Sequence, residues 1–398
     1  MKSAASGHHL SLLKGADAYF PALIQAIDAS QFEVRLETYI FNFHGSGQQV
    51  AQALVRAASR GVAVFLAMDG IGTPGLPAHW QEQFNQSGVA WQIFRPLGRF
   101  GMFLPSRWRR LHRKLCVVDG QQAFCGGINL LDDWFDPRHG DLDAPRFDFA
   151  VLVSGPLVQA VHAAMAQFWW RLQATQSARQ IDLAGTWQAL QQAAQNQRKP
   201  RDARPGGGAT AELVLRDNVR NRTRIERAYR QAIGLARQEI VLANAYFLPG
   251  RKMRMALTHA ARRGVRVRLL LQGRYEYWLQ HAASRALYDQ LLAAGVEIHE
   301  YHASFLHAKV AVVDGLWATV GSSNIDPLSL LLAREANVVV HDPAFSAELL
   351  GQLEQAMVQG AQRIDPIHHA TRSLALRMVD RLALLAIRAI LFMIGKRY

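Results

Sequence analysis

Two scarcities set the first limits on this sequence of 398 residues: it has only two cysteines, and only 19% of its residues are charged. Two cysteines exclude a small disulfide-stabilised scaffold. Low charge combined with 50% hydrophobic residues excludes an intrinsically disordered chain. No apolar run reaches the roughly 18 to 20 residues of a membrane-spanning helix, and the amino-terminal residues lack the apolar core of a signal peptide. We therefore expect a large globular protein on the cytoplasmic side.

Acidic residues are also scarce. The chain has 45 lysines and arginines against 31 aspartates and glutamates, which gives a net charge of +14. Such an excess favours a polyanionic partner, a class that includes nucleic acid, anionic membranes and phosphorylated substrates. Composition alone does not choose among these three.

The two cysteines, Cys116 and Cys125, flank an expected turn at 119–122. If that turn closes a hairpin in which 118 pairs with 123, the two cysteines pair with each other and face one another across two strands. A reducing compartment disfavours disulfides, so we predict two buried, reduced thiols. Their spacing does not match that of a zinc site.

The chain contains an internal duplication. Three segments recur later in the same order, 33–41 as 239–247, 57–70 as 259–273, and 111–129 as 306–324. These matches set His112 against His307 and Tyr39 against Tyr246. The offset drifts slowly, as loop insertions would cause, so the sequence indicates one duplication of a large unit rather than a solenoid of short repeats.

Each repeat has the pattern of an α/β unit. Amphipathic stretches at 16–29 and 223–237 precede apolar strands, and a later helix ends at Gly61 or Gly264, where a helix C-cap is expected. Strands that alternate with helices predict sheets covered by helices on both faces. We predict an α/β protein of two similar α/β/α halves, related by a pseudo-twofold axis and sharing one active site. The expected division is a first half at 1–183, a linker at 184–211, a second half at 212–365 and an amphipathic tail at 366–398.

A motif with chemical potential occurs once in each half. His112, Lys114 and Asp119 have the spacing H-x-K-x-x-x-x-D, which His307, Lys309 and Asp314 repeat. Residues two apart on a strand point to one face, so each histidine is expected beside its lysine. A single H-x-K is weak evidence, since such residues are often on the surface. Two copies with the same continuation indicate a catalytic site.

A loop of small residues follows each motif and ends in an amide, Asn129 in the first half and Asn324 in the second. Backbone N–H groups and side-chain donors in such a loop bind anions. We therefore predict that Asn129, Asn324 and Ser322 bind phosphate. Metal-ligand spacings are not found elsewhere, so no metal or cofactor is expected.

The paired motifs resemble the phospholipase D superfamily, and the resemblance covers nearly the whole chain. More narrowly, the segments ETYIF, RRLHRKLCVVDG, ANAYFLPG and LHAKVAVVDGLWATVGSSNIDPLSL resemble the bacterial cardiolipin synthases, specifically the shorter B type without amino-terminal transmembrane helices. The resemblance implies a phosphatidyltransferase that uses a covalent phosphohistidine. Spacing leaves open which histidine is the nucleophile, and the resemblance puts it in the first motif, so His112 is expected to attack and His307 to act as acid and base.

Each histidine requires a carboxylate to fix its tautomer. Asp119 and Asp314 belong to the motif and are counted with its catalytic residues, but each follows a strand and is expected to hold the turn. Asp148 and Glu335 are better candidates for orienting the histidines, because each opens a strand and has a proline eight residues later. The alternative is that both are surface acids at strand edges.

The run from Arg95 to Lys114 is basic and has no acid, and it is interleaved with Phe100, Met102, Phe103, Leu104, Pro105 and Trp108. Apolar side chains between arginines favour a loop that enters lipid headgroups and acyl chains over one that stacks on bases. The alternative is a loop packed on its own domain. Nucleic acid is thus disfavoured as a partner, and two intact motifs disfavour a catalytically inactive binding module.

The resemblance also implies the substrate. Phosphatidylglycerol would be the phosphatidyl donor, and a second phosphatidylglycerol the acceptor, giving cardiolipin and glycerol. Another alcohol or water remains possible as acceptor, so a phospholipase D-type hydrolase or a nuclease is the alternative activity. The sequence makes no prediction about protein partners.

The carboxyl-terminal stretch 371–394 predicts an amphipathic helix. Its arginines Arg377, Arg381 and Arg388 fall within about 40° of one another on a helical wheel. Its apolar run of roughly 13 residues is too short to span the hydrocarbon core, and an arginine stripe on an apolar helix suits a membrane interface. We expect peripheral attachment to the cytoplasmic face of the inner membrane. The alternative is a helix docked on the body or on a partner chain.

Overall fold

A computed structural model of the chain describes residues 5–98, 107–136, 139–179, 208–217, 221–274, 277–327 and 333–393. The elements of the first half are β1 (Ala5–Lys14), α1 (Gly15–Asp28), β2 (Glu33–Thr38), α2 (Gly45–Ser59), β3 (Ala63–Asp69), α3 (Ala78–Ser87), β4 (Ala90–Phe94), β5 (Arg110–Leu111), β6 (Lys114–Val118), β7 (Gln122–Gly126), β8 (Phe135–Asp136), β9 (Gly140–Asp141), β10 (Phe149–Ser154) and α4 (Leu157–Arg179).

The second half repeats most of this order. Its elements are β11 (Ala209–Arg216), α6 (Arg224–Leu235), β12 (Glu239–Asn244), α7 (Arg251–Arg262), β13 (Arg266–Gln272), α8 (Trp278–Arg285), α9 (Tyr288–Leu292), β14 (Glu297–Tyr301), β15 (Lys309–Val313), β16 (Trp317–Gly321), β17 (Ala333–His341), α11 (Pro343–Gly360), β18 (Ala361–Arg363), α12 (Pro366–Ala370) and α13 (Leu374–Met393). The predicted alternation of strands and helices is confirmed in both halves.

Glycine ends the corresponding helices in the two halves, as predicted. Gly61 follows the last turn of α2 and Gly264 that of α7, both with a φ of 89°. Only glycine adopts this left-handed conformation without steric cost, so each helix stops there and the chain turns into the next parallel strand. The strands that follow, β3 and β13, are buried along most of their length.

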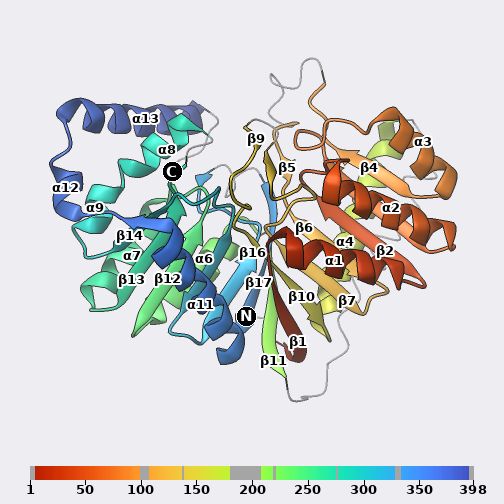
Figure 1. Cartoon of the computed structure of the whole chain (residues 1–398), viewed down its shortest axis with the longest axis horizontal. Helices are drawn as coiled ribbons and strands as arrows, with labels where there is room; N and C mark the ends of the chain where they lie inside the picture. Colours follow the sequence, from red (N-terminus) through yellow and green to blue (C-terminus); the bar gives the residue numbers. More distant parts are fainter. Residues whose placement is uncertain are drawn as a thin grey trace.

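The strand order reads almost the same from either end, which is the pattern expected for a pseudo-twofold axis (Figure 1). Outward from the centre, the first half has β1, β10, β7, β6, β2, β3 and β4, and the second has β11, β17, β16, β15, β12, β13 and β14. In each half three strands are parallel and the others antiparallel. The predicted α/β fold with two similar halves is confirmed.

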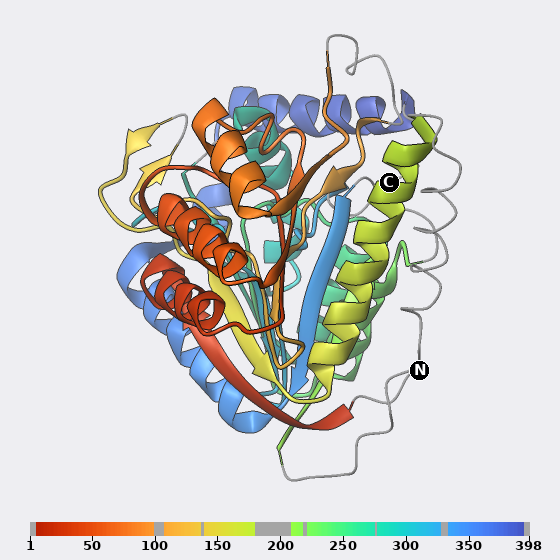
Figure 2. The ribbon, with the colours of Figure 1, turned by 90° about the vertical axis from the view of Figure 1, so that its right-hand side faces the viewer.

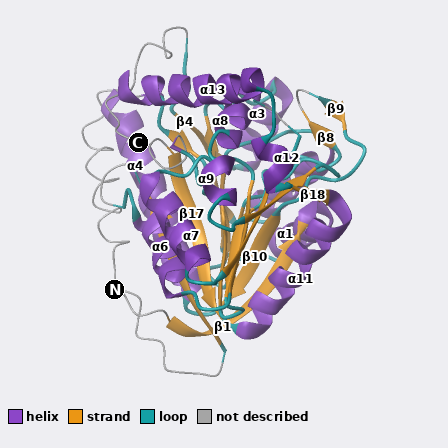
Figure 3. Cartoon of the chain, turned by 90° about the vertical axis from the view of Figure 1, so that its left-hand side faces the viewer, coloured by secondary structure: helices purple, strands orange, loops and turns teal. Residues whose placement is uncertain are grey.

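The two halves share a core. One buried cluster combines Val117 and Val151 of the first half with Val312 and Val338 of the second. The antiparallel pair β1–β11 joins the halves at the centre, and helices α4 and α11 each pack against strands of both halves. Figure 2 shows the central strands of the two halves running side by side with α4 along one flank, and Figure 3 shows α11 on the other. The halves therefore form one continuous body.

The predicted register of the hairpin β6–β7 is wrong by one residue. Asp119 and Gly120 both have positive φ, and the N–H of Gln121 bonds to the carbonyl of Val118, so pairing resumes at Gln122. Cys116 therefore pairs with Phe124, and Cys125 with Leu115. Side chains alternate along a strand, so the two thiols lie on opposite faces of the sheet. Both cysteines are buried and free, as predicted.

The boundaries of the halves can be compared with the expected division. Strand β11 begins at Ala209, three residues before the expected start of the second half at 212, and most of the expected linker at 184–211 lies outside the described residues. The expected tail at 366–398 consists of α12 and α13 as far as Met393. In Figures 1 and 3, α13 lies across the end of the molecule beside α8.

Candidate active site

The two motifs occupy equivalent positions at the starts of β6 and β15, strands that pair with β2 and β12. Lys114 and Lys309 are fully buried, at 3% and 0% exposure. The ammonium group of each donates to the carbonyl of its own motif histidine, His112 at 2.8 Å and His307 in the second copy. These bonds fix each lysine beside its histidine, as the spacing predicted.

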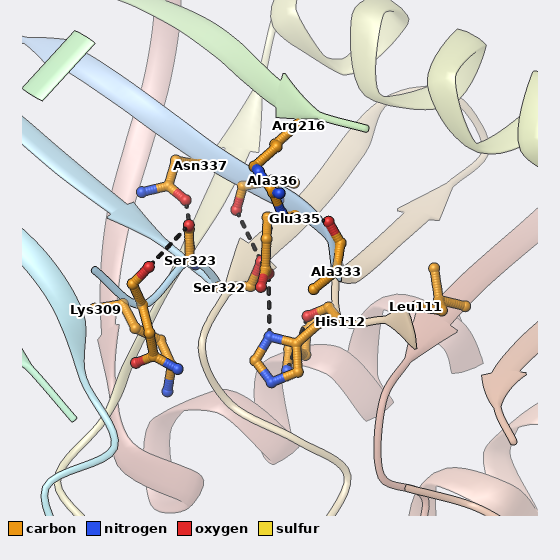
Figure 4. A network of polar contacts seen from close by, with 12 residues as sticks. Leu111, His112, Arg216, Lys309, Ser322, Ser323, Ala333, Glu335, Ala336 and Asn337 are labelled. Atoms are coloured by element: carbon orange, nitrogen blue, oxygen red, sulfur yellow. Dashed lines mark hydrogen bonds and ion pairs between the residues drawn. The ribbon is translucent and has the colours of Figure 1, made fainter. Parts of the chain in front are cut away.

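Each histidine contacts a carboxylate that comes from the other half of the chain. His112 Nδ1 lies 3.0 Å from Glu335 Oε2 at the start of β17 (Figure 4), and His307 Nδ1 lies 2.6 Å from Asp148 Oδ2 beside β10. An Nδ1–H that donates to a carboxylate leaves Nε2 with its lone pair. Both carboxylates chosen from the sequence thus contact a motif histidine, and each contacts the histidine of the other half.

The two carboxylates are held differently. The Ser322 hydroxyl donates to Glu335 Oε2 at 2.5 Å, as Figure 4 shows. At the equivalent position in the first half is Gly127, where a Cβ would lie 2.3 Å from Asp148 Oδ1. Asp148 instead accepts the N–H of Phe149 at 2.8 Å. Ser322, predicted to bind phosphate, therefore contacts the carboxylate, because its loop runs beside the start of β17.

The motif aspartates do not contact the histidines. Asp119 accepts the backbone N–H groups of Gln31, Phe32 and Glu33 at 2.8 to 2.9 Å. Asp314 accepts those of residues 237, 238 and 239 at the same distances. Both lie at the far end of a five-residue strand from the histidine. As expected, they hold the turn, and they fix the chain that leads into β2 and β12.

Asn129 and Asn324 occupy equivalent positions and are buried. The side-chain oxygen of Asn129 accepts the N–H of Ile40 at 3.3 Å, and that of Asn324 accepts the N–H of Tyr246 at 3.4 Å. Because the oxygen of each amide is held by the backbone, the NH₂ group is the end that can donate to an anion.

The charges of both motifs act on one another. Burial lowers the pKa of His112, and it lowers the pKa of His307 well below the usual range, where both lysines add to the effect. Burial also lowers the pKa of Lys114 to about 7, and Lys309 contributes to this. Burial raises the pKa of Asp148 to about 6. Each group responds to charges of the other motif, so the two motifs form a single site.

Comparisons with known proteins show the family of this chain. A family profile described as "Cardiolipin synthase, PLD-like domain" matches residues 23–169 and 229–357, one stretch in each half and together more than half of the chain. The chain belongs to this cardiolipin synthase family. Cardiolipin synthase B of Escherichia coli (strain K12) is 37% identical over 361 residues, which are 90% of this chain and 83% of that protein. The resemblance to the bacterial B type is thereby confirmed.

More distant relatives extend the comparison. A probable cardiolipin synthase of Bacillus subtilis (strain 168) is 27% identical over 94% of this chain and 71% of its own length. Among solved structures, a phosphatidylserine synthase of Haemophilus influenzae Rd KW20 has a TM-score of 0.67, with 12% identity over 97% of this chain and 94% of that one. At 12% identity, this likeness shows that the two proteins share a fold.

Two side chains that position the motifs were missed from the sequence. Asp69, at the end of β3, accepts the N–H of Leu111 at 2.7 Å. Gln272, at the end of β13, accepts the N–H of Leu306 at 3.0 Å. Each therefore fixes the residue before a motif histidine. The sequence could have indicated both residues, because each directly precedes the glycine that ends a repeated segment.

Tyr39 and Arg216 were also missed. The ring centroid of Tyr39 lies 4.9 Å from that of His112, and Lys114 Nζ lies 5.3 Å from the same tyrosine ring. Arg216 is 1% exposed and donates to the carbonyl of Ala333 at 2.6 Å, in a strand where it is paired with Glu335. Burial lowers the pKa of Arg216 to about 10. The sequence could have indicated Arg216, because an arginine at the end of an apolar strand is unusual.

The match of Tyr39 to Tyr246 is wrong. The N–H groups of Glu33 and Glu239 bond to equivalent aspartates, and those of Ile40 and Tyr246 bond to equivalent asparagines. The same offset separates Glu33 from Glu239 and Ile40 from Tyr246. With that offset, Tyr39 corresponds to residue 245, which is alanine. The two tyrosines therefore occupy neighbouring positions rather than the same one.

The residues predicted to bind membrane have different outcomes. Phe100, Met102, Phe103 and Leu104 lie outside the described residues. Helix α13 is formed, and one side of it packs on α8 through Ala383, Leu384 and Ile387. Arg377 lies 3.8 Å from Asp289 of the body, whereas Arg381 and Arg388 are exposed. The predicted single stripe of three arginines is therefore divided between the body and solvent.

The other side of α13 is apolar and exposed. Its exposed large side chains include Leu374, Leu376, Met378, Leu382, Leu385 and Phe392. No helix in the described part of the chain has the length and apolarity to cross a membrane. The same residues contain no group of three or more histidine, cysteine, aspartate or glutamate side chains suited to a metal ion.

Proposed function

We propose that this protein transfers the phosphatidyl group of phosphatidylglycerol to an alcohol acceptor, a second phosphatidylglycerol, and so makes cardiolipin and releases glycerol. The observation that carries the proposal is the pair of histidines, each bonded through Nδ1 to a buried carboxylate and each beside a buried lysine. This set supplies a nucleophile, an acid and two cations, which phosphodiester exchange requires. Membership of the cardiolipin synthase family supports the lipid substrate.

In the proposed mechanism, His112 attacks phosphorus through Nε2 and forms a covalent phosphohistidine. His307 gives a proton to the departing glycerol oxygen and then removes a proton from the acceptor hydroxyl. Lys114 and Lys309, with the amide groups of Asn129 and Asn324, stabilise the phosphoryl oxygens in the transition state. Glu335 and Asp148 hold the two imidazoles in the tautomer that each step needs.

The charges of the empty site suit a substrate that is an anion. Burial and the two lysines favour neutral histidines, which suits a nucleophile but not an acid. A bound phosphodiester brings a negative charge between the lysines and offsets their repulsion of an imidazolium. His307, with Asp148 at 2.6 Å, can then carry the proton that the leaving group needs.

We further propose that the protein binds the cytoplasmic face of the inner membrane peripherally through α13. The exposed apolar side of this helix would enter the interface, and Arg381 and Arg388 would contact lipid phosphates. Strand β5, which leads into His112, lies toward the same end of the molecule as α13 (Figure 1). A membrane bound there would present its headgroups on the side of the active site.

The test is incubation of the purified protein with phosphatidylglycerol vesicles and, separately, with single-stranded DNA, with products identified by mass spectrometry. Cardiolipin and glycerol from the first reaction and intact DNA in the second are expected. Phosphatidic acid without cardiolipin would identify a phospholipase D-type hydrolase, and cleaved DNA would identify a nuclease. Either result would contradict the proposed transferase.

A further inference from the structure

The two halves differ in what lies beside the motif histidines. In the first half, the Tyr39 ring contacts His112, and nearby Phe43 stacks on Phe41 with ring centroids 4.3 Å apart and meets Trp80 in a tilted contact at 5.8 Å. The space between the end of β2 and helix α3 is thus filled by aromatic rings. In the second half, Ala245 replaces Tyr39, and its small side chain leaves the equivalent space open.

A cavity occupies this space in the second half. Its walls include Ala245, Tyr246, Gln272, Tyr277, Gln280 and His281. Two of these wall residues bond directly to the chain around His307. The Ala245 N–H donates to the carbonyl of Ala308 at 3.0 Å, and Gln272 accepts the N–H of Leu306. The walls of the cavity are therefore bonded to the backbone on both sides of His307.

The walls combine polar, uncharged groups with the apolar side chains of Ala245, Phe247 and Leu271. Phenol, amide and imidazole groups line the cavity, and none of the described residues that line it is a lysine, arginine, aspartate or glutamate. Burial lowers the pKa of His281, which keeps its ring neutral. A phosphate would find no counter-charge here, whereas a neutral group with several hydroxyls can exchange hydrogen bonds with such walls.

We propose that this cavity is the alcohol subsite and binds the glycerol moiety, first of the departing headgroup and then of the acceptor. The proposal rests on the transferase function proposed above. In phosphoryl transfer the attacking and leaving atoms are roughly in line on opposite sides of phosphorus. An alcohol held beside His307 therefore leaves on the side of that histidine, and the nucleophile on the opposite side is His112.

The steps balance without a further reactant. As His112 Nε2 forms the N–P bond, the P–O bond to glycerol breaks, and the departing oxygen takes the proton of His307. The acceptor glycerol moiety then binds in the same cavity and gives its hydroxyl proton to His307. Its oxygen forms a new P–O bond as the N–P bond breaks. One cavity thus serves the leaving alcohol and the entering alcohol in turn.

The experiment is a competition for one phosphoenzyme. The full-length protein receives phosphatidylglycerol vesicles with deuterated glycerol and ethanol together, and mass spectrometry gives the ratio of deuterated phosphatidylglycerol to phosphatidylethanol. This ratio depends only on how the phosphoenzyme chooses its acceptor, and donor binding and nucleophilic attack do not affect it. Ethanol serves as a small alcohol that lacks the additional hydroxyls of glycerol.

Two variants change the cavity. Gln280→Leu removes a polar wall group and should lower the ratio about three- to tenfold, the effect of losing one hydrogen bond. Ala245→Tyr fills the space as the first half does and should lower the ratio by at least as much, while hydrolysis to phosphatidic acid continues. Gln83→Leu, the same change on the exposed face of α3 in the first half, is the matched control and should leave the ratio unaltered.

The possible failures are distinct. An unchanged ratio in both folded cavity variants, with cardiolipin still formed, would overturn the subsite and leave the transferase standing. An equal loss of transfer to glycerol, transfer to ethanol and hydrolysis would also overturn it, because the cavity would then only support the fold. A wild-type protein that forms no cardiolipin and transfers to neither alcohol would overturn the proposed function and the subsite with it.

Discussion

Each motif histidine depends on a residue from the other half, and this determines how single substitutions should act. Glu335 is fully buried, and its contacts are the imidazole of His112 and the hydroxyl of Ser322. Asp148 is 2% exposed and contacts His307. A carboxylate buried in this way has no solvent to replace a lost partner, so removing either member of a pair should lower stability as well as impair the chemistry.

The first prediction concerns the histidines themselves. His112→Ala and His307→Ala should each lower the transfer rate by several orders of magnitude, because one removes the nucleophile and the other the acid and base. The variants should remain folded by circular dichroism, with a melting temperature lowered by the loss of the bond to the buried carboxylate. More than about 1% of wild-type activity in either variant would contradict a two-histidine covalent mechanism.

The second prediction concerns the carboxylate of His112. Glu335→Gln keeps the size of the side chain but offers an amide where Nδ1–H requires an acceptor of negative charge, so kcat should fall on the order of 10²- to 10⁴-fold with KM nearly unchanged. Ser322→Gly, which gives this loop the residue of the first half, removes one hydrogen bond to Glu335 and should cost roughly tenfold or less. Steady-state kinetics on both variants test the order of effects; a larger loss for Ser322→Gly would be contrary to it.

The third prediction is a narrow pH profile. Lys114 loses its positive charge as pH rises through its pKa of about 7, so attraction of the phosphodiester and kcat/KM should decline above that pH. Asp148 gains a proton as pH falls through its pKa of about 6 and no longer accepts from His307, so kcat/KM should also decline below it. Lys114→Arg, whose guanidinium stays charged, should move the alkaline decline upward. Melting temperatures at each pH separate these effects from unfolding.

At the scale of residues, the sequence predicted which side chains form the site but not which carboxylate contacts which histidine. Duplication of the motif identified His112, Lys114, His307 and Lys309, because two copies rule out coincidence. It could not assign Glu335 to His112, since the pairing depends on how the two halves pack. The contact of the Ser322 hydroxyl with Glu335 could not be predicted for the same reason, because Glu335 lies on a strand that follows later in the chain.

At the scale of elements, the repeated strands and helices follow from local pattern, whereas errors arose where geometry is set by a turn or a neighbour. The one-residue error in the β6–β7 register came from the tight Asp119–Gly120 turn, since both residues have positive φ. The helix α13 was correctly predicted as amphipathic; its docking on the body is confirmed for one side, and its attachment to a membrane stays a prediction. One side docks on α8, which turns Arg377 toward Asp289, and the other side is apolar and exposed.

The fourth prediction tests the exposed side of α13. Leu382 and Leu385 are 60% and 56% exposed, so replacing both by glutamate should leave the fold intact. Burial of a leucine contributes about 1.5 to 3 kcal/mol, so binding to anionic vesicles should weaken roughly tenfold or more for each change. Activity on vesicles should fall while activity on detergent-dispersed lipid is maintained.

A matched control for this test is Leu235→Glu, the same change at a leucine that is 79% exposed at the end of α6. It should leave vesicle binding unaltered. Equal binding by the control and the α13 variant would mean that attachment comes from elsewhere. Removal of the whole tail is a poorer test, because His369 of α12 is buried against the ring of Tyr288.

At the scale of the whole molecule, duplication explains the near-palindromic strand order, and the shared core explains why neither half is a separate domain. Apolar strand residues of both halves lie in one cluster, and β1 pairs with β11 at the centre. The sequence predicted two halves and one site, because each motif supplies half of the groups required. It could not give the strand order across the junction, which no local pattern encodes.

The last prediction follows from that shared site. Separately produced pieces 1–183 and 208–398, the second starting before β11, should each be inactive, since each lacks one histidine and the carboxylate of the other. Exposure of the shared core should also make them prone to aggregate, so a second measurement is needed. Full-length His112→Ala and His307→Ala chains, mixed in equal amounts, each retain an intact core. The mixture should stay below about 1% of wild-type activity, because the surviving histidines are on different chains and lie in different sites. Recovery well above that level would mean that the halves of two chains combine, and the site would then belong to a dimer rather than to one chain.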